Sequence, residues 1–301
     1  MSDATSSFPK RCFVQTYTAG EEPPPDFALV ATELRKRGVE VVALTTGEIT
    51  ASTPAPVWST LTRRDLVVGD FVWTRAALRA LKVPMPPAPD YPECLRALLH
   101  RRVWRSTLGG VQMALRSQPA AAQQRHDQEP LVFVKPAEDA KAFSAIIEPR
   151  DSMIDFFTAE LGTDVPVWCA EVLPMRDEYR VYVIDGAIRS VCRYMTKQPP
   201  QAQEDASGGE APSPSSLDLG IVKDAVATLA AQQPELCAGC ALDFATVVDD
   251  ASKAATATKT MTALIEVNDG YSLGRYPGLS GAAYTDLLVR RWQSIVVASD
   301  G

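Results

Sequence analysis

The first third of the chain alternates between strand and helix patterns, and this alternation limits the folds that it can adopt. RCFVQTY (residues 11–17) and VEVVALT (39–45) are short runs of mainly apolar and β-branched residues. Between them, DFALVATELRKRG (26–38) has the spacing of an amphipathic helix and ends at a glycine. LVVGDFVWTRAALRAL (66–81) leads from a third strand into a second helix. Strand, helix and strand in this order favour a parallel sheet, so we expect a small α/β domain.

Beyond a proline-rich connection the pattern changes. CLRALLHRRVWRSTLGGV (94–111) has helical spacing and reaches two glycines, so we expect a helix there. Strand patterns follow, and Asp185-Gly186 between two of them predicts a tight hairpin. We therefore expect an α/β chain with one domain over residues 1–90 and a second over 91–301. Polar segments low in apolar residues predict flexible inserts near 117–129, 198–216 and 249–260.

Charge and composition exclude several partners. The 301 residues carry a formal net charge of -7, whereas nucleic acids and anionic membranes attract clustered positive charge, so we expect neither as a partner. No apolar segment reaches transmembrane or signal-peptide length, which predicts a cytoplasmic protein. The six cysteines are scattered in apolar sequence, as reduced thiols are. Cys237 and Cys240 have the spacing of a zinc or redox pair but lack a second pair of ligands nearby.

Polar residues interrupt the apolar strand patterns at four places after residue 130. Each one alone fits a strand with one solvent-facing side. Together they supply what a nucleoside triphosphate needs: a lysine for phosphate, an acid for ribose, and oxygen ligands for magnesium. Glu266 and Asn268 are separated by one residue, so they share a face of their strand. In chain order they are Lys135, Glu171 and Glu178, Asp243, and Glu266 with Asn268.

This ordered series resembles the ATP-grasp superfamily of carboxylate-amine ligases. The resemblance covers roughly residues 95–292, and the strings EYRVYVIDG and IEVNDGYSLGRYPG are most similar to its arginine-and-lysine clade. It implies an ATP-grasp fold in which two α/β subdomains clasp ATP, preceded by a small Rossmann-like α/β domain. It also implies an ADP-forming ligase that uses ATP and Mg²⁺ and joins a carboxylate to an amine through an acylphosphate.

The resemblance implies a role for each matching position. Lys135 would contact the α- and β-phosphates, and Glu178 would bind the ribose. The adenine edge would be read by the backbone of Glu171, Val172 and Leu173. Arg101, Arg102 and Arg105 all match the segment of a further phosphate-binding residue, and we choose Arg102. The magnesium ligands would be Asp243, Glu266 and Asn268.

Two departures from the superfamily pattern leave alternatives open. The phosphate-covering loop, PAEDAKAFSA, lacks glycine, so Lys141 would replace backbone contacts. Ala241 stands where an arginine is common, so charge stabilisation would come from Arg180, Arg193 or Arg275. An ATP-binding sensor or interaction module without ligase activity is the alternative. The substrate, a small molecule, amino acid or peptide, stays open, as does the choice between monomer and homodimer.

Overall fold

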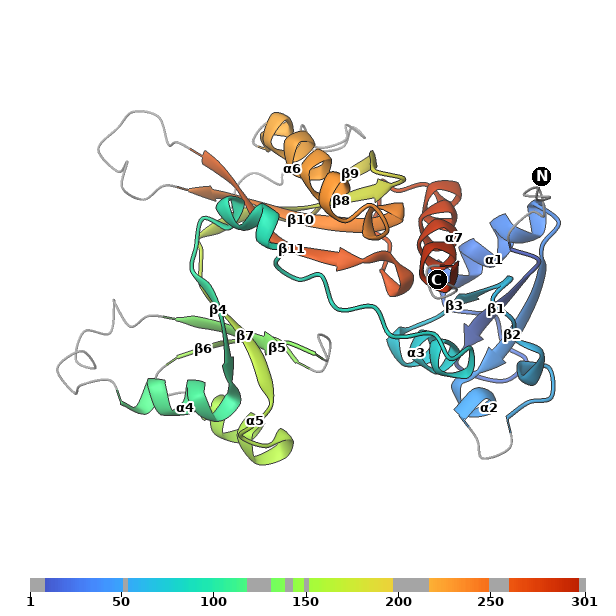
Figure 1. Ribbon diagram of the computed structural model, residues 1–301, viewed down its shortest axis with the longest axis horizontal. Helices are drawn as coiled ribbons and strands as arrows, with labels where there is room; N and C mark the ends of the chain where they lie inside the picture. Colours follow the sequence, from blue (N-terminus) through green and yellow to red (C-terminus); the bar gives the residue numbers. More distant parts are fainter. Residues whose placement is uncertain are drawn as a thin grey trace, which may run out of the picture. The chain divides into compact units, whose positions relative to one another are not determined.

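The chain forms two compact units in its computed structural model, and each is described by itself (Figure 1). Unit 1 comprises Met1–Arg96, Arg176–Thr246 and Thr260–Gly301, and unit 2 comprises Ala97–Met175 and Val247–Lys259. The predicted inserts lie outside the described residues except at Ser117 and Thr260, and the domain boundary at residues 90–91 stays a prediction. The structure describes residues 9–50, 54–117, 131–138, 143–148, 152–196, 217–248 and 260–297.

Unit 1 begins with the parallel sheet that the sequence predicts. Strand β1 (Arg11–Thr16) lies between β2 (Glu40–Thr45) and β3 (Asp65–Val68), and both pairings are parallel. Helix α1 (Pro25–Lys36) begins at a proline, where the missing N–H is not needed. Helix α3 (Phe71–Ala80) begins after Asp70, whose carboxylate accepts a hydrogen bond from the Trp73 N–H. A short helix, α2 (Thr46–Thr50), and a 3-10 turn, η1 (Trp58–Thr60), connect β2 to β3.

A four-stranded sheet of order β11-β10-β8-β9 forms the second part of unit 1. The predicted hairpin is confirmed: Asp185 and Gly186 have φ angles of 50° and 72°, the left-handed values that a tight two-residue turn requires. Helix α6 (Leu219–Gln232) lies over one face of this sheet (Figure 1). The strands are β8 (Met175–Ile184), β9 (Ala187–Thr196), β10 (Gly239–Val248) and β11 (Thr260–Asp269). The short turns are η5 (Leu236–Ala238) and η7 (Gly270–Ser272).

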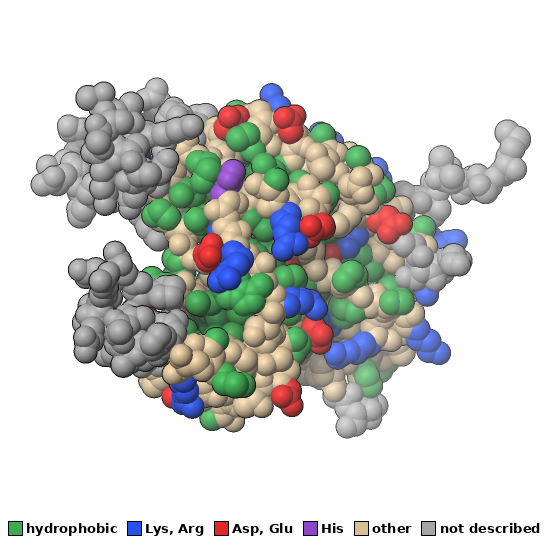
Figure 2. Space-filling view, turned by 60° about the vertical axis from the view of Figure 1, so that its left-hand side comes forward, with side chains coloured by type: hydrophobic (Ala, Val, Ile, Leu, Met, Phe, Trp, Pro, Cys, Tyr) green, Lys and Arg blue, Asp and Glu red, His purple; other side chains and the backbone are tan. Residues whose placement is uncertain are grey.

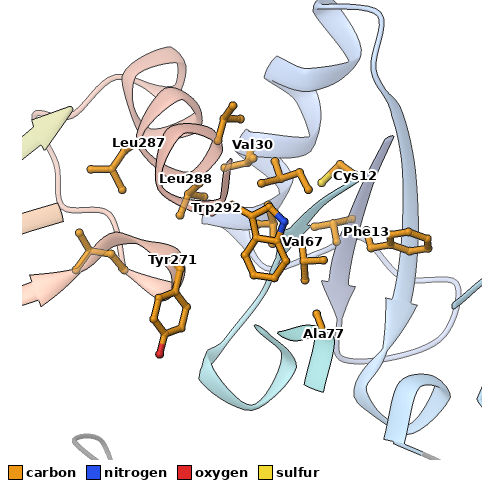
Figure 3. Packing of buried hydrophobic residues seen from close by; sticks show 14 of the residues in the cluster. Cys12, Phe13, Val30, Val67, Ala77, Tyr271, Leu287, Leu288 and Trp292 are labelled. Atoms are coloured by element: carbon orange, nitrogen blue, oxygen red, sulfur yellow. The ribbon is translucent and has the colours of Figure 1, made fainter. Parts of the chain in front are cut away.

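Helix α7 (Gly281–Val297), near the end of the chain, completes the core around the first sheet. Its Trp292 indole extends among residues of α1 and β3, including Val30 and Val67 (Figure 3). The indole N–H also donates to the Asp65 carbonyl at 2.9 Å. Because Trp292 is buried and its one polar atom is paired, it contributes apolar burial without an unsatisfied donor. The first and last segments of the described chain therefore share one core.

Unit 2 contains an antiparallel sheet of order β4-β7-β5-β6, and its structure corrects one sequence prediction. The helix expected over residues 94–111 is wrong. The region begins with the 3-10 turn η2 (Glu93–Leu99), continues as strand β4 (Val103–Thr107), and enters helix α4 (Leu108–Arg116). Pairing of β4 with β7 outweighs the helical spacing of the local sequence. The other elements are β5 (Val132–Pro136), β6 (Ala145–Ile147), α5 (Met153–Leu161) and β7 (Pro166–Glu171).

The surface carries charges of both signs. On the face shown in Figure 2, lysine and arginine side chains of the described residues are interspersed with acidic and apolar side chains. Such mixing produces no broad field of one sign on that face. Among the described residues, no helix is both long enough and apolar enough to cross a lipid bilayer.

The shared core of unit 1 predicts a large effect for Trp292→Ala. Truncating a buried tryptophan removes apolar burial and leaves a cavity, so we expect the free energy of unfolding to fall by about 3–5 kcal/mol. Val297→Ala, at an exposed position of the same helix, serves as the control and should change it by less than about 0.5 kcal/mol. Urea unfolding followed by circular dichroism measures both. Equal effects of the two variants would contradict the role of Trp292.

Candidate active site

One face of the four-stranded sheet of unit 1 gathers the predicted ligands. Strand β10 lies between β8 and β11, so side chains that point to the same side of these three strands are neighbours. On β8, Glu178 and Arg180 alternate with the buried residues Tyr179 and Val181. The same face continues to Tyr182, which belongs to the core cluster around the first sheet. The polar face therefore borders directly on the hydrophobic core.

Asp243, the predicted ligand on the central strand β10, is held by Arg180. The Arg180 guanidinium donates from Nε to Oδ1 at 2.8 Å and from Nη2 to Oδ2 at 2.7 Å. Asp243 is only 2% exposed, and the Arg180 side chain is 11% exposed. A bidentate pair of this kind is strong and fixes both groups in one plane. Of the three arginines predicted for catalysis, Arg180 is thus brought to the predicted ligands.

Asn268 connects the two acidic residues predicted as ligands. Its Nδ2 donates to Asp243 Oδ2 and to Glu266 Oε1, at 3.1 Å each. Glu266 and Asn268 share a face of β11, as their spacing predicts. All three predicted ligands are therefore brought together. No three His, Cys, Asp or Glu side chains cluster for a metal within the described ranges, and the third oxygen donor here would be the Asn268 amide.

Opposing effects act on the Asp243 carboxyl. Burial raises its pKa above the ordinary value, since a buried charge loses its hydration. The hydrogen bonds and positive charge of Arg180 lower the pKa, whereas the negative charges of Glu266 and Glu178 raise it. Asp243 is therefore paired with one guanidinium while two further carboxylates act on it by repulsion. A bound divalent cation would relieve this repulsion.

The loop after β11 is fixed by hydrogen bonds within unit 1. The Tyr182 hydroxyl donates to the Gly274 carbonyl at 3.0 Å and accepts from the Tyr276 N–H at 2.8 Å. The Tyr284 hydroxyl donates to the Leu273 carbonyl at 2.7 Å. These bonds hold the loop against β8 and α7 in a defined conformation.

Arg275, also predicted for catalysis, is bound away from the three ligands. Its Nε donates to Asp26 Oδ1 of α1 at 3.2 Å, and its Nη1 donates to the Leu279 carbonyl at 3.1 Å. The structure thus gives this arginine a role in connecting the loop to the first helix.

Asp269, next to the predicted ligand Asn268, is held by a second buried ion pair. Arg291 of α7 donates to both of its carboxylate oxygens, at 2.7 and 2.6 Å. Its Nη1 also donates to the Glu235 carbonyl. Close backbone approach at Gly270 requires glycine, because a Cβ there would collide with the Gly239 carbonyl. These contacts fix the end of β11, and neither Asp269 nor Arg291 was among the residues predicted from the sequence.

Glu178, the predicted ribose ligand, lies on the same face with a tyrosine partner. The Tyr194 hydroxyl of β9 donates to Glu178 Oε2 at 2.9 Å. The Tyr194 ring stacks on Tyr276, with centroids 4.5 Å apart and planes 5° apart. The Arg180 guanidinium lies 4.8 Å from the Tyr276 ring centroid, within cation–π distance. Glu178, Arg180 and the loop are thus linked through two aromatic rings.

Arg193 is not brought to the ligands. It lies opposite Tyr179 in the β8–β9 register, and its Nη1 is 3.7 Å from Asp177 Oδ1. Regular pairing counted from the hairpin would place Arg193 opposite Glu178. A register shift between Tyr182 and Val183 moves it by one residue, and one residue reverses the side to which a strand residue points.

Unit 2 holds the remaining predicted residues. Lys135 is 4% exposed and lies opposite Trp168 in the β5–β7 register, while Arg105 lies opposite Trp168 on the other side. These three residues therefore share one sheet face. The buried core of α4 and α5 includes Val134 and Cys169, which point to the opposite face.

Arg102 contacts Glu171 and is not part of the face that Lys135, Trp168 and Arg105 share. The Arg102 N–H donates to Glu171 Oε2 at 3.0 Å, and its carbonyl accepts from the Glu171 N–H at 3.1 Å. Val172 and Leu173 follow β7, where the Leu173 carbonyl accepts from the Met175 N–H. Lys141 lies outside the described residues.

The fold is that of ATP-grasp enzymes. It matches D-alanine–D-alanine ligase from Bacillus anthracis complexed with ATP, with a TM-score of 0.54, 13% identity, 97% of this chain covered and 100% of the other. It matches D-cycloserine synthetase with a TM-score of 0.54 and 15% identity, over 95% of this chain and 99% of the other. It also matches a RimK domain ATP-grasp protein from Sphaerobacter thermophilus with a TM-score of 0.50 and 14% identity, over 96% of this chain and 100% of the other. No curated protein sequence matches the chain.

The chain belongs to the ATP-grasp domain family described as family 2 of the arginine-and-lysine clade, whose model matches residues 98–287. The resemblance drawn from the ordered polar residues is thereby confirmed, and the mixed α/β fold with it. Membership also supports the predicted activity class, an ADP-forming ligase that uses ATP to join a carboxylate to an amine.

The buried ion pair predicts a pH-dependent loss of stability in Arg180→Gln. Removing one partner of a buried pair costs about 3–5 kcal/mol, so we expect the free energy of unfolding to fall by about 3 kcal/mol at pH 8. Without Arg180, the pKa of Asp243 rises further above its value in the unfolded chain. The stability loss is complete above the pKa that Asp243 has in the folded variant. It fades as the pH falls toward the pKa that Asp243 has in the unfolded chain. Urea unfolding should therefore show a smaller loss at pH 5 than at pH 8.

The double variant Arg180→Gln/Asp243→Asn is the matched control, because it removes both charges. It should recover most of the stability lost at pH 8 and show little difference between the two pH values. An equal loss at pH 5 and pH 8 in the single variant would show that the orphaned Asp243 charge is not the cause.

Proposed function

We propose that the chain is an ATP- and Mg²⁺-dependent ligase that joins a carboxylate to an amine through an acylphosphate. The carboxylate oxygen attacks the γ-phosphorus of ATP and ADP leaves; the amine nitrogen then attacks the acyl carbon and phosphate leaves. The observation that carries this proposal is the convergence of Asp243, Glu266 and Asn268, linked by the two 3.1 Å hydrogen bonds of Asn268.

The three residues fit a magnesium site by their chemistry. Carboxylate and amide oxygens are the hard donors that Mg²⁺ takes in proteins. A carboxylate has about four lone-pair positions, and the three hydrogen bonds to Asp243 leave it able to bind a cation as well. Asp243, Glu266 and Asn268 would hold the ion, which neutralises charge on the β- and γ-phosphates when bound.

We propose a nucleotide role for each remaining predicted residue, taking each unit by itself. In unit 1, Glu178 accepts hydrogen bonds from the ribose, and Arg180 stabilises negative charge while holding Asp243 in place. In unit 2, Lys135 contacts phosphate, and the backbone of Glu171 to Leu173 reads the adenine edge. Arg105 shares the face of Lys135, whereas the Arg102 guanidinium lies 3.5 Å from Glu171 Oε1, so we favour Arg105 for the further phosphate contact.

The loop that follows the ligands is the proposed place of the acceptor. Tyrosine hydroxyls donate to the backbone carbonyls of Leu273 and Gly274, and the backbone N–H of Tyr276 donates to a tyrosine hydroxyl. A rigid loop excludes water and orients a nucleophile without an ordering cost at each turnover. Neighbouring folds act on amino acids or related small molecules, as their names D-alanine–D-alanine ligase and D-cycloserine synthetase state. We therefore propose a free amino acid or a short peptide as the acceptor.

A screen for inorganic phosphate release over amino acids, dipeptides and peptides tests the activity, with mass spectrometry of the products. Asp243→Asn and Glu266→Ala should each lower phosphate release by at least about 100-fold, since a ligand of the charge-neutralising ion is lost. They should also reduce the rise in melting temperature that ATP and Mg²⁺ produce together. Asp224→Asn, at an exposed position of α6, is the control and should leave both unchanged.

The outcomes separate the proposal from its alternatives. Magnesium-dependent ATP binding without phosphate release across the whole panel would favour a sensor or interaction module. Unchanged ATP consumption in Glu266→Ala would show that the assigned ligands are wrong. If ATP and Mg²⁺ had no effect on the melting temperature of the unmodified chain, the proposed nucleotide site itself would be contradicted.

A further inference from the structure

Tyr194 lies at a bulge in β9, beside Glu178. Tyr179 lies opposite Arg193 and Glu178 lies opposite Met195, which leaves Tyr194 between these pairs as the extra residue of β9. A bulge bends its strand and redirects a side chain, and bulges are frequent next to active sites. Here the redirected side chain donates its hydroxyl hydrogen to Glu178 Oε2 at 2.9 Å.

We propose that Tyr194 is a positioning residue that orients the Glu178 carboxylate toward a ribose, and thereby makes the chain prefer ribonucleotides to deoxyribonucleotides. This inference rests on the proposed function, in which Glu178 binds the ribose of ATP. A free glutamate side chain samples many rotamers, and ordering it on binding weakens affinity. With Oε2 held by Tyr194, Oε1 and the remaining lone pair of Oε2 can accept bonds from ribose hydroxyls.

The Tyr194 ring is itself held in place by its neighbours. It stacks on Tyr276 at 4.5 Å, and the Tyr276 N–H donates to the Tyr182 hydroxyl at 2.8 Å. The Arg180 guanidinium lies 5.8 Å from the Tyr194 ring centroid. The orientation of the Glu178 carboxylate therefore depends on the loop that contains Tyr276. A positioning residue must be immobile in this way to preorganise its partner.

The protonation state of Tyr194 suits a donor. Burial raises the pKa of its hydroxyl well above the ordinary value, and the negative charges of Asp243 and Glu178 raise it further, while Arg180 lowers it. The hydroxyl therefore stays protonated at neutral pH. A phenylalanine at this position keeps the ring and its stacking but removes the donor.

Binding of ATP, 2′-deoxyATP and 3′-deoxyATP to the full chain with Mg²⁺, measured by calorimetry, tests the inference. A hydrogen bond to a charged group is worth about tenfold or more in affinity, so we expect ATP to bind at least about tenfold more tightly than one of the deoxy analogues. Tyr194→Phe should reduce this ratio to about threefold or less, because the Glu178 carboxylate is no longer oriented. Glu178→Gln should reduce it similarly, and the double variant should show no further reduction.

Tyr17→Phe is the matched control. It removes the same hydroxyl from an exposed tyrosine that follows β1, outside the sheet that carries Glu178 and Tyr194, so the ratio should stay that of the unmodified chain. Melting temperatures without nucleotide verify that each variant folds. A wild-type ratio in Tyr194→Phe overturns the inference while Glu178 keeps its proposed role. Equal binding of ATP and both deoxy analogues by the unmodified chain overturns the ribose role of Glu178 as well.

Discussion

The ion pair between Arg180 and Asp243 is the interaction on which the candidate site depends. It lies where β8 and β10 are neighbours, with Asp243 almost fully buried. An unpaired carboxylate at such depth is strongly destabilising. Because Arg180 compensates it, the same sheet face can also carry Glu178 and Glu266. The excess of acid over base that remains is what a divalent cation would balance, so folding and ligand binding draw on the same charges.

The packing around this pair restrains the residues of the site. The sheet face that carries Arg180 continues through Tyr182 into the core that α7 completes around the first sheet. Tyr182 belongs to that core and also holds the loop after β11 by two hydrogen bonds. Asp269 joins the end of the ligand strand to Arg291 of α7. The hydrophobic core, which begins at Tyr182 two residues after Arg180, therefore fixes the positions of the polar residues.

Most strands, the hairpin and the gathering of the predicted metal ligands on one sheet face could be predicted from the sequence, because each leaves a local signal. A polar side chain in an apolar strand pattern is such a signal, and it singled out Asp243, Glu266 and Asn268. Strand β4 was missed because its residues continue the helical spacing of the preceding segment, and only its pairing with β7 decides the conformation. The partners of Arg180, Asp269 and Glu178 are distant in sequence, so local patterns could not supply them.

The irregular pairing of β8 and β9 affects how related chains can be compared. Two register shifts decide that Tyr194, and not Arg193, meets Glu178. A relative with an uninterrupted β9 would present the residue equivalent to Arg193 to the acidic face instead. Two aligned letters would then stand on opposite sides of the sheet, in different chemical surroundings. Within this family, inheritance of a site residue must therefore be judged by strand register before it is judged by identity.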